Sequence, residues 1–256
     1  MINNFFLQEK FLILAYDHGL EHGPSDFSKE NFNPDFILEI ASKEKVSAIV
    51  LTPGVAEKFY PKFQTEVPLI LKLNGKTKFF QGEPVSLAFA SIDLAKKLNA
   101  IAVGYTLYPG SRYESLMFKE FGRIKEEAHQ KGLGVIAWIY PKGKSIENET
   151  DSKIIKYAAR IGLELGADLI KIKYPSENIF SLKSLFEEIR RISPKVKIAL
   201  AGGKKLEEEE FLEVVKSAME SGLNGIVVGR NVWQGDNPYL MIEKIKKIIF
   251  KENEII

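Results

Sequence analysis

Eight short apolar runs, rich in β-branched residues, recur along the chain at regular spacing and limit the folds it can adopt. Between them lie segments whose apolar residues follow a helical period, such as Ile154, Ala158 and Ile161. Gly132 and Gly166 stand just before two of the runs, where helices commonly end. The eight predicted strands cover residues 11–16, 48–51, 69–73, 100–105, 134–140, 168–174, 197–201 and 225–229.

This order predicts one large α/β domain. Strand and helix alternating eight times within 256 residues matches the length and order of a (β/α)8 barrel. A doubly wound sheet also alternates, but it usually has fewer strands, and no glycine-rich dinucleotide turn follows the first predicted strand. We therefore expect a single-domain TIM barrel spanning residues 1–256, with its longest irregular stretches at 17–33 and 52–67.

The composition limits the partners that the chain can bind. It contains 36 basic and 34 acidic residues, so it lacks the positive charge expected for binding nucleic acid or an anionic membrane. It contains no cysteine, which excludes disulfides, thiolate metal sites and cysteine nucleophiles. The N-terminus does not resemble a signal peptide, and no apolar run approaches the roughly 18 residues needed to span a bilayer. We expect a soluble cytoplasmic protein.

The sixth predicted strand carries two lysines within an apolar run. Successive side chains of a strand face opposite sides, so Lys171 and Lys173 share one face while Ile170 and Ile172 share the other. A lysine inside a barrel is unfavourable unless it is paired or neutral. The two lysines therefore indicate a functional role.

One such role is Schiff-base chemistry. An amine acts as a nucleophile only when it is neutral, and a lysine with an ordinary pKa needs roughly 4 to 5 kcal/mol to lose its proton at pH 7. Burial or a second cation lowers that requirement, and Lys173 could supply the cation beside Lys171. The pattern equally allows the lysines to pair with carboxylates such as Asp17 or to bind an anion. Alternation does not decide which lysine would be the nucleophile.

The last two predicted strands end in a pattern typical of phosphate sites. Barrels of this class have their active sites at the carboxyl ends of the strands and often bind phosphate in the loops after strands seven and eight. Glycine lets the backbone approach the anion, and arginine adds a charge-assisted contact. The alternative is a tight turn and a surface cation. The residues concerned are Gly202, Gly203, Gly229 and Arg230.

Tyr140 and Asp17 lie at the ends of two other predicted strands and would complete a Schiff-base site. A retro-aldol step needs a group that takes a hydroxyl proton, and imine formation needs a group that shuttles protons. The alternative is a core tyrosine and a loop-capping aspartate. His18 and His22 resemble metal ligands, but no clear third ligand accompanies them, so we interpret them as loop-packing or hydrogen-bonding residues.

Six motifs at the predicted strand ends occur in order along the chain. They are Ala15–Pro24, Leu71–Thr77, Gly104–Ser111, Trp138–Pro141, Lys171–Tyr174 and Gly229–Gln234. Together they closely resemble the motifs of the archaeal-type class I fructose-1,6-bisphosphate aldolases. The resemblance extends from the first predicted strand to the last.

The resemblance implies a lyase of glycolysis and gluconeogenesis that reversibly cleaves fructose 1,6-bisphosphate to dihydroxyacetone phosphate and glyceraldehyde 3-phosphate. It implies a lysine imine at Lys171, with no metal and no cofactor. Tyr140 would transfer protons, Trp138 would position the substrate and Asp17 would assist imine formation. The family forms homo-oligomers, commonly decamers, so we expect an oligomer. The substrate phosphate would bind Gly202, Gly203, Gly229 and Arg230.

Two other functions stay open. One is a related imine-forming aldolase or transaldolase acting on another phosphorylated ketose, such as 2-amino-3,7-dideoxy-threo-hept-6-ulosonate synthase. Trp138 beside Tyr140 favours the fructose-bisphosphate enzyme over this alternative. The other is a sugar-phosphate-binding barrel without catalysis, which would not need two inward lysines. Ala201 stands where the family often has serine, which removes one hydroxyl donor to the phosphate.

Overall fold

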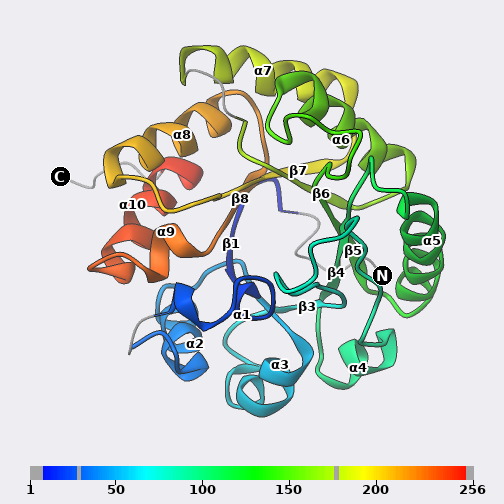
Figure 1. Ribbon diagram of the computed structural model, residues 1–256. Coiled ribbons are helices and arrows are strands. Elements are labelled where there is room, and N and C mark those ends of the chain that lie inside the picture. Colours follow the sequence, from blue (N-terminus) through cyan, green and yellow to red (C-terminus); the bar gives the residue numbers. More distant parts are fainter. Residues whose placement is uncertain (1–7, 28–29, 176–178, 252–256) are drawn as a thin grey trace.

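The computed structural model describes residues 8–27, 30–175 and 179–251. Eight parallel strands follow one another around a closed barrel, and β1 completes it by pairing with β8 (Figure 1). The fold is a single-domain TIM barrel, as predicted. The strands are β1 (Phe11–Tyr16), β2 (Ala48–Leu51), β3 (Leu69–Lys72), β4 (Ala102–Leu107), β5 (Gly134–Ile139), β6 (Leu169–Ile172), β7 (Lys197–Ala201) and β8 (Gly225–Val228).

Helices follow every strand and surround the barrel (Figure 1). The two stretches predicted to be irregular, 17–33 and 52–67, contain short helices. In the described ranges, no helix combines the length and apolar character needed to cross a membrane. The helices are α1 (His18–His22), η2 (Pro24–Asp26), α2 (Pro34–Lys43), α3 (Pro53–Phe59), η3 (Tyr60–Phe63), α4 (Ile92–Lys97), α5 (Glu114–Gln130), α6 (Ser152–Glu164), α7 (Ile179–Ile192), α8 (Glu208–Glu220), α9 (Arg230–Trp233) and α10 (Pro238–Phe250).

Three strands (β1, β2 and β7) have the predicted bounds, and the other five differ from prediction by one or two residues at one or both ends. The fourth strand begins at Ala102, not at Ala100, because the N–H of Ala100 donates to the carbonyl of Ala95 and completes the end of α4. Gly132 and Gly166 do close helices before strands, with φ of 71° and 79°.

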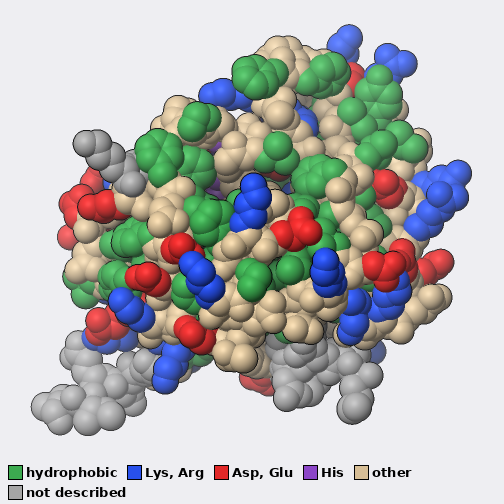
Figure 2. All heavy atoms as spheres, turned by 90° about the horizontal axis from the view of Figure 1, so that it is seen from below, with side chains coloured by type: hydrophobic (Ala, Val, Ile, Leu, Met, Phe, Trp, Pro, Cys, Tyr) green, Lys and Arg blue, Asp and Glu red, His purple; other side chains and the backbone are tan. Residues whose placement is uncertain are grey.

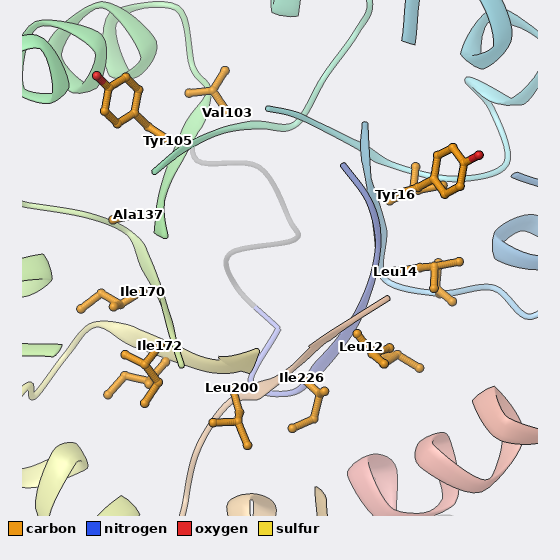
Figure 3. Packing of buried hydrophobic residues seen from close by; sticks show 14 of the residues in the cluster. Leu12, Leu14, Tyr16, Val103, Tyr105, Ala137, Ile170, Ile172, Leu200 and Ile226 are labelled. Atoms are coloured by element: carbon orange, nitrogen blue, oxygen red, sulfur yellow. The ribbon is translucent and has the colours of Figure 1, made fainter. Parts of the chain in front are cut away.

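Alternation along the strands divides the core into two layers. Leu12, Leu14 and Ile170 point from their strands toward the surrounding helices (Figure 3). Ile13 and Leu169, one residue out of phase with them, pack in a separate cluster inside the barrel. The odd-numbered positions of β6 therefore face the barrel interior, as the alternating pattern predicted.

Candidate active site

A cavity of about 770 Å³ lies at the carboxyl ends of the strands. Its walls come from the ends of β1, β5, β6, β7 and β8 and from the loops that follow them. All eight residues singled out in the sequence line it, so the structure brings the complete set together. They are Asp17, Trp138, Tyr140, Lys171, Gly202, Gly203, Gly229 and Arg230.

Lys171 is the buried amine of this cavity, with 5% of the residue exposed. It pairs in register with Trp138 on β5, and its Nζ lies 5.2 Å from the centroid of the indole. No described residue forms a hydrogen bond or ion pair with this Nζ. Burial lowers the pKa of Lys171 to about 8, although the carboxylate of Asp17 acts in the opposite direction. About a tenth of the amine is therefore neutral at pH 7.

Asp17 and His18 form the wall next to β1. Burial alone would raise the pKa of Asp17, but nearby positive charge, led by Lys171 and including Lys72, outweighs burial and the pKa is lowered. Burial lowers the pKa of His18 to about 4, so its imidazole is neutral at pH 7. The cavity thus pairs an ionised carboxylate with an uncharged imidazole, whose Nδ1 lies 3.6 Å from Oδ1 of Asp17.

The geometry of the histidines agrees with a packing role. The ring of His18 lies 5.6 Å from that of Trp233 and 5.8 Å from that of His22. Across the part of the chain that the structure describes, no group of three His, Asp or Glu side chains is arranged to hold a metal ion.

Tyr140 follows β5, and its backbone N–H donates to the carbonyl of Leu107 at 3.0 Å. Burial, followed by the charge of Asp17, raises the pKa of Tyr140 well above the ordinary value of 10. The phenol is therefore protonated at rest and can donate a proton inside the cavity.

Lys173 does not have the role expected from its position. Its ammonium is paired with the carboxylate of Glu149, which also lies 3.3 Å from Lys142. The cation that acts most strongly on Lys171 is Lys72, on β3. The expectation that Lys173 keeps Lys171 neutral is therefore wrong, because a neighbouring carboxylate compensates its charge.

Asn231 and Arg230 hold the two glycine loops together. The side-chain amide of Asn231 donates to the carbonyl of Gly202 at 2.6 Å and to that of Lys204 at 3.0 Å. Arg230 donates from Nη2 to the carbonyl of Gly203 at 3.0 Å, and its Nη1 lies 3.4 Å from Asp26. These bonds fix the shape of the loops before any anion binds.

The two glycines after β7 are not equivalent. The N–H of Gly202 already donates to the carbonyl of Val227 at 3.0 Å, so it is not available to donate to an anion. Gly202 can only let an anion come close to the backbone, because it has no side chain. Gly203 has a φ of 66°, in the left-handed region that favours glycine. An anion-binding loop here would depend on Gly203, Arg230 and their neighbours.

Sequence reasoning placed Lys72 in one of the strand-end motifs but gave it no role. Lys72 carries the same signal as Lys171, a lysine inside an apolar strand, and only 2% of it is exposed. The sequence also did not reveal that the indole Nε1 of Trp138 is buried without an acceptor among the described residues. No local pattern reports such a donor, because it depends on which neighbours fold around the ring.

Comparisons with known proteins agree with this geometry. Residues 11–235 match the model of the DeoC/LacD family of aldolases. The class 1 fructose-bisphosphate aldolase of Thermoproteus tenax is 44% identical over 96% of this chain and 92% of its own length. That of Halobacterium salinarum is 39% identical over the same shares.

A solved structure is equally similar. It is an archaeal fructose-1,6-bisphosphate aldolase whose catalytic lysine is covalently bound to the carbinolamine intermediate of the substrate. It has a TM-score of 0.89 and 42% identity, and the match covers 97% of this chain and 96% of that one. Sequence and fold thus point to the same group of proteins.

Proposed function

Since the chain belongs to the DeoC/LacD family of aldolases, we propose that Lys171 is the residue with which it forms a Schiff base. The observation that carries this assignment is a buried amine, with no paired partner among the described residues and a pKa lowered to about 8, inside the cavity. An amine of this kind is nucleophilic near neutral pH.

The chain is a class I fructose-bisphosphate aldolase, a lyase that acts through a Schiff base. It cleaves fructose 1,6-bisphosphate reversibly to dihydroxyacetone phosphate and glyceraldehyde 3-phosphate, a step of glycolysis and gluconeogenesis. Of the functions left open by the sequence, this identity decides against a barrel without catalysis. It also decides against a different phosphorylated ketose as the main substrate.

Imine formation begins when the neutral amine of Lys171 attacks the C2 carbonyl of the ketose. The nitrogen must then lose a proton, and the ionised carboxylate of Asp17 on the facing wall is suited to accept it and to pass it to the C2 oxygen, which becomes the carbinolamine hydroxyl. Tyr140 can donate its proton to the departing hydroxyl of the carbinolamine, so that water leaves and the imine forms. Trp138, whose indole lines the cavity next to the Lys171 amine, is suited to position the substrate.

Carbon–carbon cleavage uses the imine as the electron sink. The tyrosinate that Tyr140 becomes after donating its proton takes the proton of the C4 hydroxyl, the C3–C4 bond breaks, and its electrons move onto the imine nitrogen as an enamine. The raised pKa of Tyr140 suits this exchange, because it brings the phenol closer to the pKa of the hydroxyl it deprotonates. Reprotonation and hydrolysis then release dihydroxyacetone phosphate.

A phosphate of the substrate would lie against the loops after β7 and β8. Arg230 is 17% exposed there, and its Nε is buried without an acceptor among the described residues. Gly229 leaves room for the neighbouring His18, since a Cβ added to it would lie 2.6 Å from Cε1 of that ring. Arg230 and the three glycines Gly202, Gly203 and Gly229 are thus proposed to anchor the phosphate and set the carbonyl beside Lys171.

Borohydride reduction in the presence of dihydroxyacetone phosphate tests this assignment. The reduced triose should be found on Lys171 by peptide mass spectrometry, and Lys171→Met should lose both the adduct and the cleavage of fructose 1,6-bisphosphate. Chelator should leave turnover unchanged, because the imine itself accepts the electrons. An adduct on Lys72 or Lys173 in active protein would refute the assignment.

We also propose that the protein is a homo-oligomer. Four of the exposed large hydrophobic side chains in the described residues lie in one segment, between β3 and α4. Figure 2 shows one face of the molecule, on which hydrophobic side chains lie exposed among basic and acidic ones. Such exposed apolar surface is typical of an interface. The four are Phe79, Phe80, Leu87 and Phe89.

Two further expectations remain proposals. One is that residues 1–256 act as one catalytic domain, which is supported by a barrel that begins at Phe11 and a last helix that ends at Phe250. Limited proteolysis that released a stable smaller fragment would contradict it. The other is a cytoplasmic location, which cell fractionation would test.

A further inference from the structure

A second buried lysine lies beside the proposed Schiff-base lysine. Lys72 ends β3, and its Nζ lies 5.6 Å from the centroid of the Trp138 indole. The Nζ of Lys171 lies 5.2 Å from the ring of the same tryptophan. The two amines therefore share one indole as a neighbour. No step of the reaction described above uses Lys72.

Oxygen atoms surround the Lys72 ammonium. It donates to the backbone carbonyl of Asn74, lies 3.4 Å from Oδ1 of the same residue, and lies 3.9 Å from a carboxylate oxygen of Glu21. Asn74 is fixed in turn: its amide donates to the carbonyls of Ser86 and Thr106 at 2.9 Å, and its Oδ1 accepts the N–H of Thr106 at 2.7 Å. This arrangement of acceptors holds the amine in a constant position.

The Lys171 amine has no such partners. Burial is the main cause of its lowered pKa. The carboxylates of Asp17 and Glu21 act in the opposite direction, and the cations of Lys72 and Arg230 lower the pKa further, Lys72 more than Arg230. Lys72 is thus the leading positive charge that opposes protonation of Lys171.

The remaining titratable groups of this wall contribute little positive charge. Burial lowers the pKa of His18 to about 4, so the imidazole is neutral at pH 7. Burial raises the pKa of Tyr140, so the phenol is neutral as well. Lys173 is compensated by Glu149. The charge balance around Lys171 therefore depends mainly on Lys72, with a smaller contribution from Arg230, and on the two carboxylates.

We propose that Lys72 is a positioning residue of the aldol reaction, whose fixed ammonium keeps the Lys171 amine in the neutral form that attacks the substrate carbonyl. Lys72 neither gives nor takes a proton and forms no bond to the substrate; it acts through its charge. The proposal rests on the role proposed for Lys171, and the experiment below separates the two.

The initial rate of borohydride trapping with dihydroxyacetone phosphate, measured against pH, tests the proposal. In the unmodified protein, trapping should rise with pH up to about 8 and then level off, as the amine loses its proton. Lys72→Met should move this acidic limb upward by about one pH unit, so trapping falls about tenfold at pH 7 and recovers at higher pH. Lys72→Arg, which keeps the charge, should leave the limb near its original position.

Lys173→Met is the matched control. It removes a lysine that lines the same cavity but whose charge is compensated by Glu149. The acidic limb of its trapping profile should not move. Lys72→Gln, which retains a hydrogen-bond donor toward Asn74 without the charge, replaces the methionine variant if that variant does not fold. A neutral variant whose trapping falls equally at every pH, or whose limb stays in place, would overturn the proposal. The absence of an adduct on Lys171 in the unmodified protein would instead refute the Schiff-base assignment.

Discussion

At the scale of single residues, Lys171 opposes folding at neutral pH. Its pKa is about 8 in the folded protein against 10.5 for an ordinary lysine. Because the folded pKa is lowered, the unfolded chain binds more protons between these two values. Stability therefore rises with pH across this window, and below it the full unfavourable contribution of the buried amine is present.

Replacing this amine should stabilise the protein. Lys171→Met is expected to raise the free energy of unfolding at pH 7 by about 3 kcal/mol. The gain should shrink to roughly 0.4 kcal/mol near pH 10.5, where the lysine is neutral in the folded protein and half neutral in the unfolded chain. Denaturant unfolding at the two pH values measures this difference. Lys153→Met, at an exposed lysine near the start of α6, should change little at either pH. An equal gain in the free energy of unfolding at both pH values would show that new apolar contacts, and not the loss of the charge, cause the effect.

At the scale of elements, β4 provides the space that the indole of Trp138, on β5, occupies. A Cβ added to Gly104 would lie 2.0 Å from Cζ3 of Trp138, so no side chain fits there while the indole keeps its place. This ring contacts the amines of both Lys72 and Lys171. A change on β4 therefore affects the indole on β5 and, through it, the lysines of β3 and β6.

Gly104→Ala should displace the indole. We expect a loss of roughly 1–3 kcal/mol in the free energy of unfolding, and a fall of roughly a hundredfold in kcat/KM for fructose 1,6-bisphosphate. Gly122→Ala in α5 is the matched control, since a Cβ there meets no atom within 4 Å. It should stabilise the protein by roughly 0.5–1 kcal/mol and leave kcat/KM unchanged. Full activity in Gly104→Ala would show that the indole can move without effect.

The sequence predicted the elements well because they depend on local periodicity. Strand and helix alternating eight times along the chain was enough to predict the barrel and the order of its strands, and alternation within the sixth strand predicted the face on which Lys171 lies. It could not reveal that Glu149 pairs with Lys173, or that Asn74 and Glu21 surround Lys72. Those partners lie on other elements, and only the closed barrel brings them together.

At the scale of the whole molecule, the segment between β3 and α4 is the best candidate for contact between copies. Phe79 is 88% exposed and Phe80 is 54% exposed, although both are large apolar side chains. The double variant Phe79→Glu, Phe80→Glu should reduce the mass measured by light scattering after size-exclusion chromatography, with the circular dichroism of the barrel unchanged. Tyr157→Glu, at a side chain of α6 that is 66% exposed, should not change the mass. An unmodified protein of monomeric mass would contradict the proposed assembly.

The indole shared by Lys72 and Lys171 gives the enzyme an optical reporter of its own. The chain contains two tryptophans. Trp233 is buried, and its Nε1 donates to the carbonyl of Ala15 at 3.1 Å, whereas the ring of Trp138 lies 5.2 Å from the Nζ of Lys171, the amine proposed to form the imine. Formation of the imine proposed on Lys171 should change the electric field at the Trp138 indole and therefore its emission. With Trp233→Phe to remove the emission of the other tryptophan, the fluorescence of unlabelled protein is expected to follow the covalent intermediate in real time.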